Sequence, residues 1–306
     1  MKQLNTPVTF IIFNRYEYAQ KVFEQIRKVK PTKLFVIADG PRQNVDGEKE
    51  AIKKTRSILE QIDWECDLHC NFSEENLGCG ERIASGLTWV FSQVDRTIVL
   101  EDDCMASEPF FFYCQELLEK YKDDERITFI AGTNYIEKEI QIEDSYTFSY
   151  FHNVWGWASW ARAWRLYDKN MSSWPEIRKT GMLRKQFGLR MALQWEDSYA
   201  SIINHKIDTW DYQWEYAQQL VNGLSIVPKI NMIENIGLFS GTHMNDDTEH
   251  NEKELELRCK EIAFPLVHPE QIKRNKKFDK TYMRCVRYDK FSYFLTRLFW
   301  HMTKKI

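Results

Sequence analysis

The chain has 306 residues, of which 43% are apolar, enough for the core of one large domain or of two closely fused lobes. Its net charge is −3, but residues 271–306 hold eleven Lys and Arg against two Asp, so the preceding part carries about −12. An acidic body of this kind argues against a nucleic-acid groove, and we predict no nucleic-acid partner.

The sequence contains no evident targeting segment. Residues 1–13 lack a charged region followed by a long apolar run, which predicts no signal peptide, and no stretch approaches the roughly eighteen apolar residues of a membrane span. Seven Cys, an odd number in a large chain, favour reduced thiols. These observations predict a cytoplasmic protein.

The first 131 residues alternate apolar runs with stretches whose apolar residues recur at helical spacing. The runs predict five buried strands, at Val8–Phe13, Leu34–Ala38, Leu68–Phe72, Thr97–Leu100 and Ile127–Ala131. The stretches predict helices: one that carries Tyr18 and Val29 and stops at Pro31, and others over about residues 47–61, from Arg82, and over 108–121. This alternation predicts an α/β fold with a doubly wound, mostly parallel sheet.

The pattern is less regular in the second half of the chain. Residues 151–167 carry four Trp, and helices are predicted over 182–204 and 212–215, with a short strand at 225–227. Residues 245–256 are acidic and polar, and we expect them to be mobile.

Three consecutive carboxylates, Glu101, Asp102 and Asp103, follow the strand that begins at Thr97. Ligands of open α/β sheets bind outside the carboxyl ends of the strands. Adjacent carboxylates repel one another, and Mg²⁺ or Mn²⁺, which prefer hard oxygen ligands, would relieve that repulsion. The alternative is a solvated acidic turn at the end of a strand.

Four stretches between residues 8 and 243 form an ordered set. They are the first strand with Asn14-Arg15 and Asp39-Gly40, the Glu101-Asp102-Asp103 triplet, the segment Trp155–Trp160, and Trp210-Asp211 followed by Asn235-Ile236-Gly237 and Thr242-His243. The set resembles inverting, metal-dependent glycosyltransferases of the GT-A fold, with the triplet in place of a D-x-D. The nearest likeness is to bacterial sugar transferases related to the animal N-acetylglucosaminyltransferase that begins hybrid N-glycans.

The resemblance implies transfer of a sugar from a nucleotide-diphosphate donor, with UDP expected, to a saccharide or glycolipid acceptor with inversion. It further implies surface polysaccharide or lipopolysaccharide synthesis. The nucleotide-sugar-binding half would span residues 1–150, the acceptor-binding half 151–265, and a basic amphipathic tail 266–306.

The resemblance also implies roles in metal binding. Asp103 resembles the carboxylate that binds Mn²⁺ or Mg²⁺ directly, and His243 resembles the late histidine that completes the metal site in many relatives. Glu101 and Asp102 resemble the neighbours that hold metal-bound water and the ribose. Such a metal is a Lewis acid placed where charge develops on the leaving diphosphate. Alternatively, His243 is a loop histidine without a role.

Inversion by direct displacement needs one base for the acceptor hydroxyl, on the face opposite the leaving group. Asp211 resembles that base, Glu215 is the second candidate one turn later, and Glu196-Asp197 is a further candidate. Alternatively, Asp211 caps the helix that follows it.

Other polar residues are predicted to contact the nucleotide. Asn14, Arg15 and Asp39 follow the first two strands, where a base and ribose would lie. Arg82, behind the glycine-bearing loop at residues 76–80, is expected to meet base or phosphate. The alternatives are surface charge for the two Arg and turn chemistry for Asp39-Gly40.

The tryptophans of residues 151–167 allow a functional and a structural interpretation. We expect Trp155, Gly156 and Trp157 to line a sugar-binding pocket, because Trp offers flat apolar faces and Gly permits close approach. We expect Trp160 and Trp164 to lie in the core.

Apolar residues of the basic tail recur at helical spacing from Phe291 to Met302, which predicts an amphipathic helix. With the surrounding Lys and Arg, residues 282–306 are expected to bind an anionic membrane surface, on the inner face of the membrane, as would suit a lipid-linked acceptor. The alternative is a terminal helix that packs on the catalytic domain.

Two other functions are compatible with the predicted fold. A sugar-phosphate nucleotidyltransferase would use a similar sheet and metal, but such enzymes usually carry a glycine-rich phosphate loop after the first strand, and Phe13–Tyr16 contains no glycine. A saccharide-binding module without turnover is the other alternative, and the presence of Asp103, Asp211 and His243 together argues against it.

Overall fold

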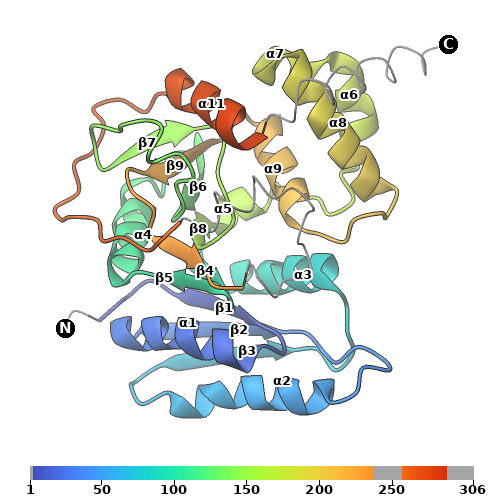
Figure 1. Cartoon of the computed structure of the whole chain (residues 1–306), viewed down its shortest axis with the longest axis vertical. Coiled ribbons are helices and arrows are strands. Elements are labelled where there is room, and N and C mark those ends of the chain that lie inside the picture. Colours follow the sequence, from blue (N-terminus) through green and yellow to red (C-terminus); the bar gives the residue numbers. More distant parts are fainter. Residues whose placement is uncertain (1–2, 238–256, 288–306) are drawn as a thin grey trace.

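The computed structural model describes residues 3–237 and 257–287, and its first four strands form one parallel half of a central sheet (Figure 1). They are β1 (Val8–Ile12), β2 (Lys33–Ala38), β3 (Asp67–Phe72) and β4 (Arg96–Glu101). β1 pairs with β2 on one side and with β4 on the other, and β3 pairs with β2. β1 and β2 are buried on both faces and are therefore almost continuously apolar, whereas β3, at the edge, is largely exposed.

Four further strands complete the sheet in the order β3-β2-β1-β4-β8-β6-β9-β7. They are β6 (Ile127–Ala131), β7 (Tyr146–Ser149), β8 (Trp157–Trp160) and β9 (Leu224–Pro228). β8 lies antiparallel between β4 and β6, and β7 lies antiparallel beside β9. The other six strands run in one direction. β7 and β8 are absent from the prediction.

Helices cover both faces of the sheet (Figure 1). Phe10 and Leu100 belong to the core on one face, and their neighbours Ile11 and Val99 belong to the core on the other, as the alternation of strand side chains requires. The first core includes α1 (Tyr16–Val29) and α4 (Glu108–Lys120), and the second includes α3 (Cys79–Phe91), α5 (Ala161–Trp164) and α9 (Asp211–Leu220). This arrangement confirms the predicted Rossmann-like α/β fold with a mostly parallel central sheet flanked by helices.

Two of the predicted helices are each divided in the structure. The region 47–61 forms α2 (Glu48–Arg56) followed by a 3-10 helix at Ser57–Gln61. The region 182–204 forms α7 (Met182–Phe187) and α8 (Leu189–Ile203), which are separated at Gly188. The positive φ of Gly188, 81°, ends the first helix and turns the chain into the second.

A third core lies within a helical lobe, at the upper right of Figure 1. It joins α6 (Trp174–Thr180), α7 and α8 to α11 (Lys276–Tyr282) and the π-helical turn Met283–Arg287. Phe278 and Tyr282 are buried there, so α11, which belongs to the basic tail, packs on the domain. The predicted tail helix at Phe291–Met302 and the predicted mobile segment 245–256 lie outside the described residues. None of the described helices has the length and apolarity needed to cross a bilayer.

A small second sheet brings the late N-I-G segment to the carboxylate triplet. β5 (Cys104–Ala106) pairs antiparallel with β10 (Ile233–Asn235), with Cys104 opposite Asn235. The N–H of Ile236 then donates to the carbonyl oxygen of Asp103 at 2.9 Å. Residues that are far apart in sequence are therefore held at the carboxyl end of β4.

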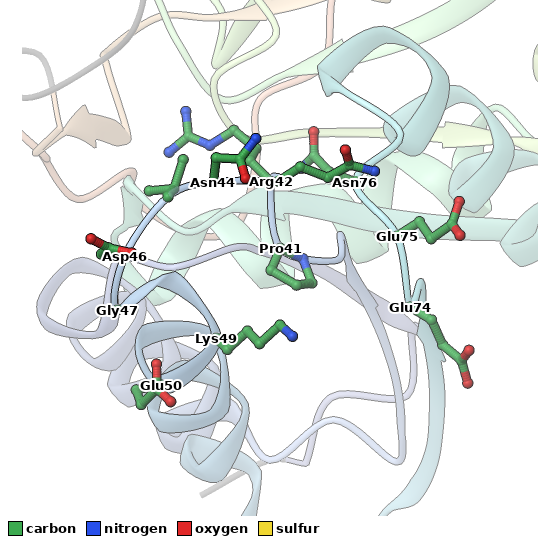
Figure 2. Close-up of a pocket in the computed structure, with 12 residues that line it drawn as sticks. Pro41, Arg42, Asn44, Asp46, Gly47, Lys49, Glu50, Glu74, Glu75 and Asn76 are labelled. Atoms are coloured by element: carbon green, nitrogen blue, oxygen red, sulfur yellow. The ribbon is translucent and has the colours of Figure 1, made fainter.

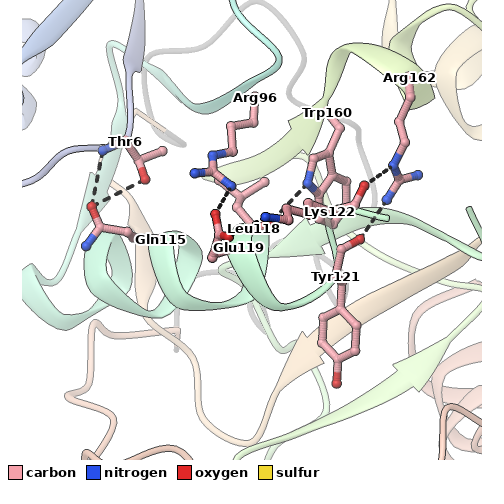
Figure 3. A network of polar contacts seen from close by, with 9 residues as sticks. All are labelled: Thr6, Arg96, Gln115, Leu118, Glu119, Tyr121, Lys122, Trp160 and Arg162. Atoms are coloured by element: carbon pink, nitrogen blue, oxygen red, sulfur yellow. Dashed lines mark hydrogen bonds and ion pairs between the residues drawn. The ribbon is translucent and has the colours of Figure 1, made fainter. Parts of the chain in front are cut away.

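The opposite end of the sheet is fixed by polar contacts to α4 (Figure 3). Arg96, at the start of β4, pairs with Glu119 at 2.6 Å, and the indole N–H of Trp160 donates to the carbonyl of Leu118 at 3.0 Å. Arg162 donates to the carbonyls of Tyr121 and Lys122. These contacts anchor β4 and β8 at the end of the sheet where β4 begins, remote from the carboxylates.

Of the four tryptophans in residues 151–167, one, Trp157, is placed differently from the prediction. Trp160 and Trp164 are buried in the core, as predicted. Trp157 is 0% exposed and stacks on Phe129 and Trp210, with ring centroids 5.2 and 5.6 Å away, so the prediction that it lines a sugar pocket is wrong. A strand residue beside a helix-covered face points into the core whatever its chemistry.

Replacing Trp157 with Ala is expected to lower the free energy of unfolding by about 3–5 kcal/mol, because the change leaves a large cavity between the sheet and α9. Urea unfolding followed by far-UV circular dichroism measures this loss. The matched control is Leu166→Ala, whose side chain is 37% exposed and for which we expect a change within about 0.5 kcal/mol. Equal effects of the two changes would contradict the assignment of Trp157 to the core.

Candidate active site

Arg15 bridges two of the three carboxylates at the end of β4. Its Nη2 lies 2.8 Å from Asp103 Oδ2 and also pairs with Asp102 Oδ1. Burial alone lowers the pKa of Arg15, but the two carboxylates outweigh it and the pKa is raised. The guanidinium therefore acts as an internal counter-ion for Asp102 and Asp103.

Glu101, the first residue of the triplet, lies in surroundings that disfavour its charged form. Burial, followed by the charges of Asp103 and Asp102, raises the pKa of Glu101 to about 8, against the opposing effect of Arg15. Asp211 adds to the same rise. Trp210, directly before Asp211, stacks on Trp157, and Trp157 pairs with Val99 of β4, so the triplet and the predicted base lie at the same end of the sheet.

Asp103 is more open to solvent than Asp102, with 14% of its side chain exposed against 5%. The chain passes directly over it at Gly237, where a Cβ would lie 2.6 Å from Asp103 Oδ2 and 3.0 Å from Arg15 Nη1. Only glycine fits so close to a carboxylate and a guanidinium. The structure therefore gives a local reason for the glycine of the N-I-G segment.

The carboxylate oxygens at the carboxyl end of β4 fit a hard divalent cation. Mg²⁺ is commonly held by one or two carboxylates together with substrate phosphates and water, which Asp103 and its neighbours can supply. Within residues 3–237 and 257–287, no three His, Cys, Asp or Glu side chains are grouped so as to hold a metal by themselves. His243, the predicted additional ligand, lies outside the described residues.

Asp211 is the first residue of α9, after Trp210 in the N-cap position. Its Oδ1 accepts from the N–H of Tyr212 at 2.9 Å and from the hydroxyl of Thr209. Its Oδ2 receives no hydrogen bond from the described part of the chain. Asp211 is therefore not the N-cap, and one of its oxygens is available to a ligand.

The other two candidates for the base are placed less favourably. Glu215 is 6% exposed, on the buried side of α9, which argues against its acting on an acceptor hydroxyl. Glu196 pairs with Arg178 at 3.0 Å within the helical lobe, on helices α8 and α6. Asp211 remains the best-placed carboxylate.

Two residues predicted to contact the nucleotide serve the protein instead. Asp39 is 8% exposed, and its carboxylate accepts from the backbone N–H groups of Gly40, Leu77 and Gly78. Arg82 is 6% exposed and donates to the carbonyls of Ala38 and Asn71. Asp39 thus follows the turn alternative, while the predicted contact of Arg82 with base or phosphate is wrong because its guanidinium is used to hold two strand ends.

Asn14 belongs to a second polar group beside the triplet. Its side-chain amide donates to Glu48 Oε1 at 2.9 Å, and Glu48, which is 3% exposed, also binds Arg42. Arg42 lines a pocket of about 790 Å³ between the loops that follow β2 and β3 (Figure 2). None of the triplet residues lines this pocket. Nucleotide contact by Asn14 and Arg15 stays a prediction.

Trp155 and Gly156 differ in what they can offer a ligand. Trp155 is half-buried and meets the ring of Tyr135 edge-on at 5.5 Å, so its proposed contact with sugar stays a prediction. Gly156 is buried, and a Cβ there would overlap Ile233 of β10. The close approach at Gly156 is therefore made by protein rather than by sugar, and that part of the prediction is wrong.

Three residues near the candidate site, Asp208, Cys79 and Tyr167, are not among the predicted site residues. Asp208 accepts from the N–H of Gly80 in the first turn of α3, and Cys79, the first residue of α3, is exposed to solvent. Burial and then the charges of Asp211 and Glu81 raise the pKa of Tyr167, whose hydroxyl has no hydrogen-bond partner among the described residues. Short sequence motifs give no signal for them, because the residues that act on them, such as Gly80 on Asp208 and Asp211 on Tyr167, are distant in the chain.

Replacing Arg15 with Gln is expected to leave Asp102 and Asp103 without their counter-ion and to lower the free energy of unfolding in EDTA by up to about 3 kcal/mol. Urea unfolding with and without Mn²⁺ measures the loss, and added Mn²⁺ should restore part of it. The control is Arg27→Gln, since Arg27 pairs with Asp63 at an exposed site where about 1 kcal/mol or less is at stake. A wild-type response of Arg15→Gln to EDTA would contradict the counter-ion role.

No family model and no curated protein sequence matches the chain. A mannosyltransferase from Pyrobaculum calidifontis, in complex with GDP-Man and Mn²⁺, is 11% identical with a TM-score of 0.38, over 54% of this chain and 48% of that chain. The chain thus spans about half the length of that enzyme.

Two further solved structures show the range of similar proteins. An active-site mutant of LgtC is 9% identical with a TM-score of 0.38, over 96% of this chain and 95% of that chain. The 4-diphosphocytidyl-2C-methyl-D-erythritol synthase from Anaerococcus prevotii is 12% identical with a TM-score of 0.36, over 55% and 76%. These likenesses concern the fold, and no residue role is taken from them.

Proposed function

We propose that the protein is a metal-dependent glycosyltransferase that transfers a sugar from a nucleotide-diphosphate sugar to a saccharide or glycolipid acceptor. The proposal rests on one geometric observation: Trp210, directly before Asp211, stacks on Trp157, and Trp157 pairs with Val99, two residues before Glu101, so the candidate base and the carboxylate triplet share one end of the sheet. A transfer reaction needs a base for the acceptor and a site for the diphosphate close together.

In the proposed reaction, Asp211 accepts the proton of the acceptor hydroxyl while that oxygen bonds to the anomeric carbon of the donor sugar. The bond from the anomeric carbon to the diphosphate oxygen breaks, and the nucleoside diphosphate leaves with the electron pair. Attack opposite the leaving group inverts the anomeric configuration. Asp103 and, by the sequence resemblance, His243 would hold a Mn²⁺ or Mg²⁺ ion, which would supply Lewis-acid neutralisation of the charge that develops on the diphosphate.

The finer features of the proposal follow from the sequence resemblance. They are a UDP-linked hexose or N-acetylhexosamine donor, surface polysaccharide or lipopolysaccharide synthesis in a bacterium, and relation to the N-acetylglucosaminyltransferase family. The division at residues 150 and 265 and a cytoplasmic location also belong to the proposal.

The purified full chain, incubated with a panel of nucleotide sugars and Mn²⁺, tests the proposal. Release of nucleoside diphosphate that stops in EDTA, together with an inverted product by NMR, is the expected result. Formation of nucleotide sugar from a triphosphate and a sugar phosphate would instead identify a nucleotidyltransferase. Saccharide binding without any turnover would identify a binding module.

We further propose that the end of the basic tail binds anionic membranes. Because Phe278 and Tyr282 belong to a core, the test deletes residues 288–306 and leaves 282–287 in place. We expect the full chain, but not the deletion variant, to float with vesicles that contain phosphatidylglycerol. Equal flotation of the two would refute membrane binding by this segment.

A further inference from the structure

The glycine-bearing segment at residues 76–80, which leads into the first turn of α3, is held from two sides. On one side, the carboxylate of Asp39 at the end of β2 accepts from the N–H groups of Leu77, at 3.0 Å, and Gly78, at 3.1 Å. On the other side, Oδ1 of Asp208 accepts from the N–H of Gly80 at 3.0 Å. Asp208 lies only three residues before Asp211, so this hydrogen bond joins the two halves of the candidate site.

The two glycines of the loop permit the contact with Asp208. A Cβ at Gly78 would lie 2.6 Å from Asp208 Oδ2, and a Cβ at Gly80 would lie 2.5 Å from Asp208 Oδ1 and 2.7 Å from the carbonyl oxygen of Thr209. Any side chain at these positions would push the segment before α9 away from the loop. The spacing of the two glycines therefore matches the contact surface of one carboxylate.

The segment that follows Asp208 is tied to α9 by two further hydrogen bonds. The hydroxyl of Thr209 donates to Asp211 Oδ1, and the side-chain amide of Gln213 donates to the carbonyl of Thr209 at 2.9 Å. A displacement of Asp208 would thus be passed on to the carboxylate of Asp211. A shift of about 1 Å in a reacting group can reduce a rate about 100-fold.

We propose that Asp208 is a positioning residue: its hydrogen bond to Gly80 holds the start of α9, and with it Asp211, at a fixed place relative to the carboxylate triplet. The inference rests on the proposed role of Asp211 as the base. Asp208 itself touches protein in this structure, and its effect on the reaction passes through Asp211.

Two variants separate the hydrogen bond from the charge. Asp208→Ala removes the acceptor for Gly80, whereas Asp208→Asn retains a carbonyl oxygen that can accept the same N–H. We expect Asp208→Ala to lower kcat about 10- to 100-fold, with the donor KM unchanged within about twofold, and Asp208→Asn to stay near wild type. Asp63→Ala, at an exposed ion pair, is the control and should behave as wild type.

Hydrogen–deuterium exchange gives a second readout that does not depend on activity. The peptide that contains Gly80 should exchange faster in Asp208→Ala and at the wild-type rate in Asp208→Asn, because only the first variant frees that amide. If no sugar donor is turned over by the wild type, the proposed function fails while this exchange result still tests the contact. Unchanged kcat and exchange in Asp208→Ala, or equal damage by Asn and Ala, would overturn the inference.

Discussion

Replacing Asp103 with Asn is expected to remove metal-dependent nucleotide binding and to lower kcat/KM by about 10³-fold or more. The loss corresponds to roughly 4 kcal/mol of electrostatic stabilisation of a developing diphosphate charge. Asp103 is the more open of the two carboxylates bound by Arg15, and an amide at this position keeps the size but loses the charge that attracts a cation. Calorimetric titration of UDP and GDP, with Mn²⁺ and with EDTA, measures the effect.

The matched control for this experiment is Asp95→Asn. Asp95 is exposed and precedes β4, at the opposite end of the same strand, so the change in net charge is the same while the site is not touched. We expect this variant to bind nucleotide as the wild type does. Mn²⁺-dependent binding that survives in Asp103→Asn would exclude Asp103 as the ligand and would weaken the proposed function as a whole.

Replacing Asp211 with Asn is expected to give the second large effect, a fall in kcat of about 10²- to 10⁴-fold, the usual contribution of a positioned general base. The amide still accepts the N–H of Tyr212, so α9 should begin as it does in the wild type. Binding of nucleotide and Mn²⁺ should stay within about twofold of wild type, because only a transition-state interaction is lost. Steady-state rates and calorimetry on the same preparation separate the two quantities.

Glu196→Gln provides the comparison for Asp211. It removes a carboxylate that pairs with Arg178 in the helical lobe, and we expect full activity from this variant. A large loss in Glu196→Gln together with a small loss in Asp211→Asn would reverse the assignment of the base. Loss of nucleotide binding in Asp211→Asn would instead point to a role for Asp211 in holding the donor.

With the exception of β3, at the exposed edge of the sheet, the strands that the sequence predicts are buried on both faces. β1, β2, β4 and β6 are short runs of Val, Ile, Leu and Phe, whose burial leaves no room for polar alternation. β8, with the sequence W-A-S-W, has no such run, and its place between β4 and β6 depends on pairing with strands that precede it by many residues. Local patterns carry no information about such an antiparallel insertion.

The site shows the same division between local and long-range information. The triplet at the end of β4 was predicted because a strand followed by carboxylates is a local signal. Ligand contacts are predicted for Asp39 and Arg82, but their partners in the structure are backbone groups that reach them only in the folded chain: Leu77 for Asp39, and the ends of β2 and β3 for Arg82. Asp208 was missed because Gly80 lies 128 residues away.

The positive charge of the Arg15 guanidinium beside Asp102 and Asp103 has a practical consequence for handling the protein. Metal-free protein already has a charge partner for both side chains, so chelation during purification should not by itself cause unfolding. A single chelated stock can then be loaded with Mg²⁺, Mn²⁺, Ca²⁺ or Co²⁺ in parallel, and ion selectivity can be compared on identical molecules.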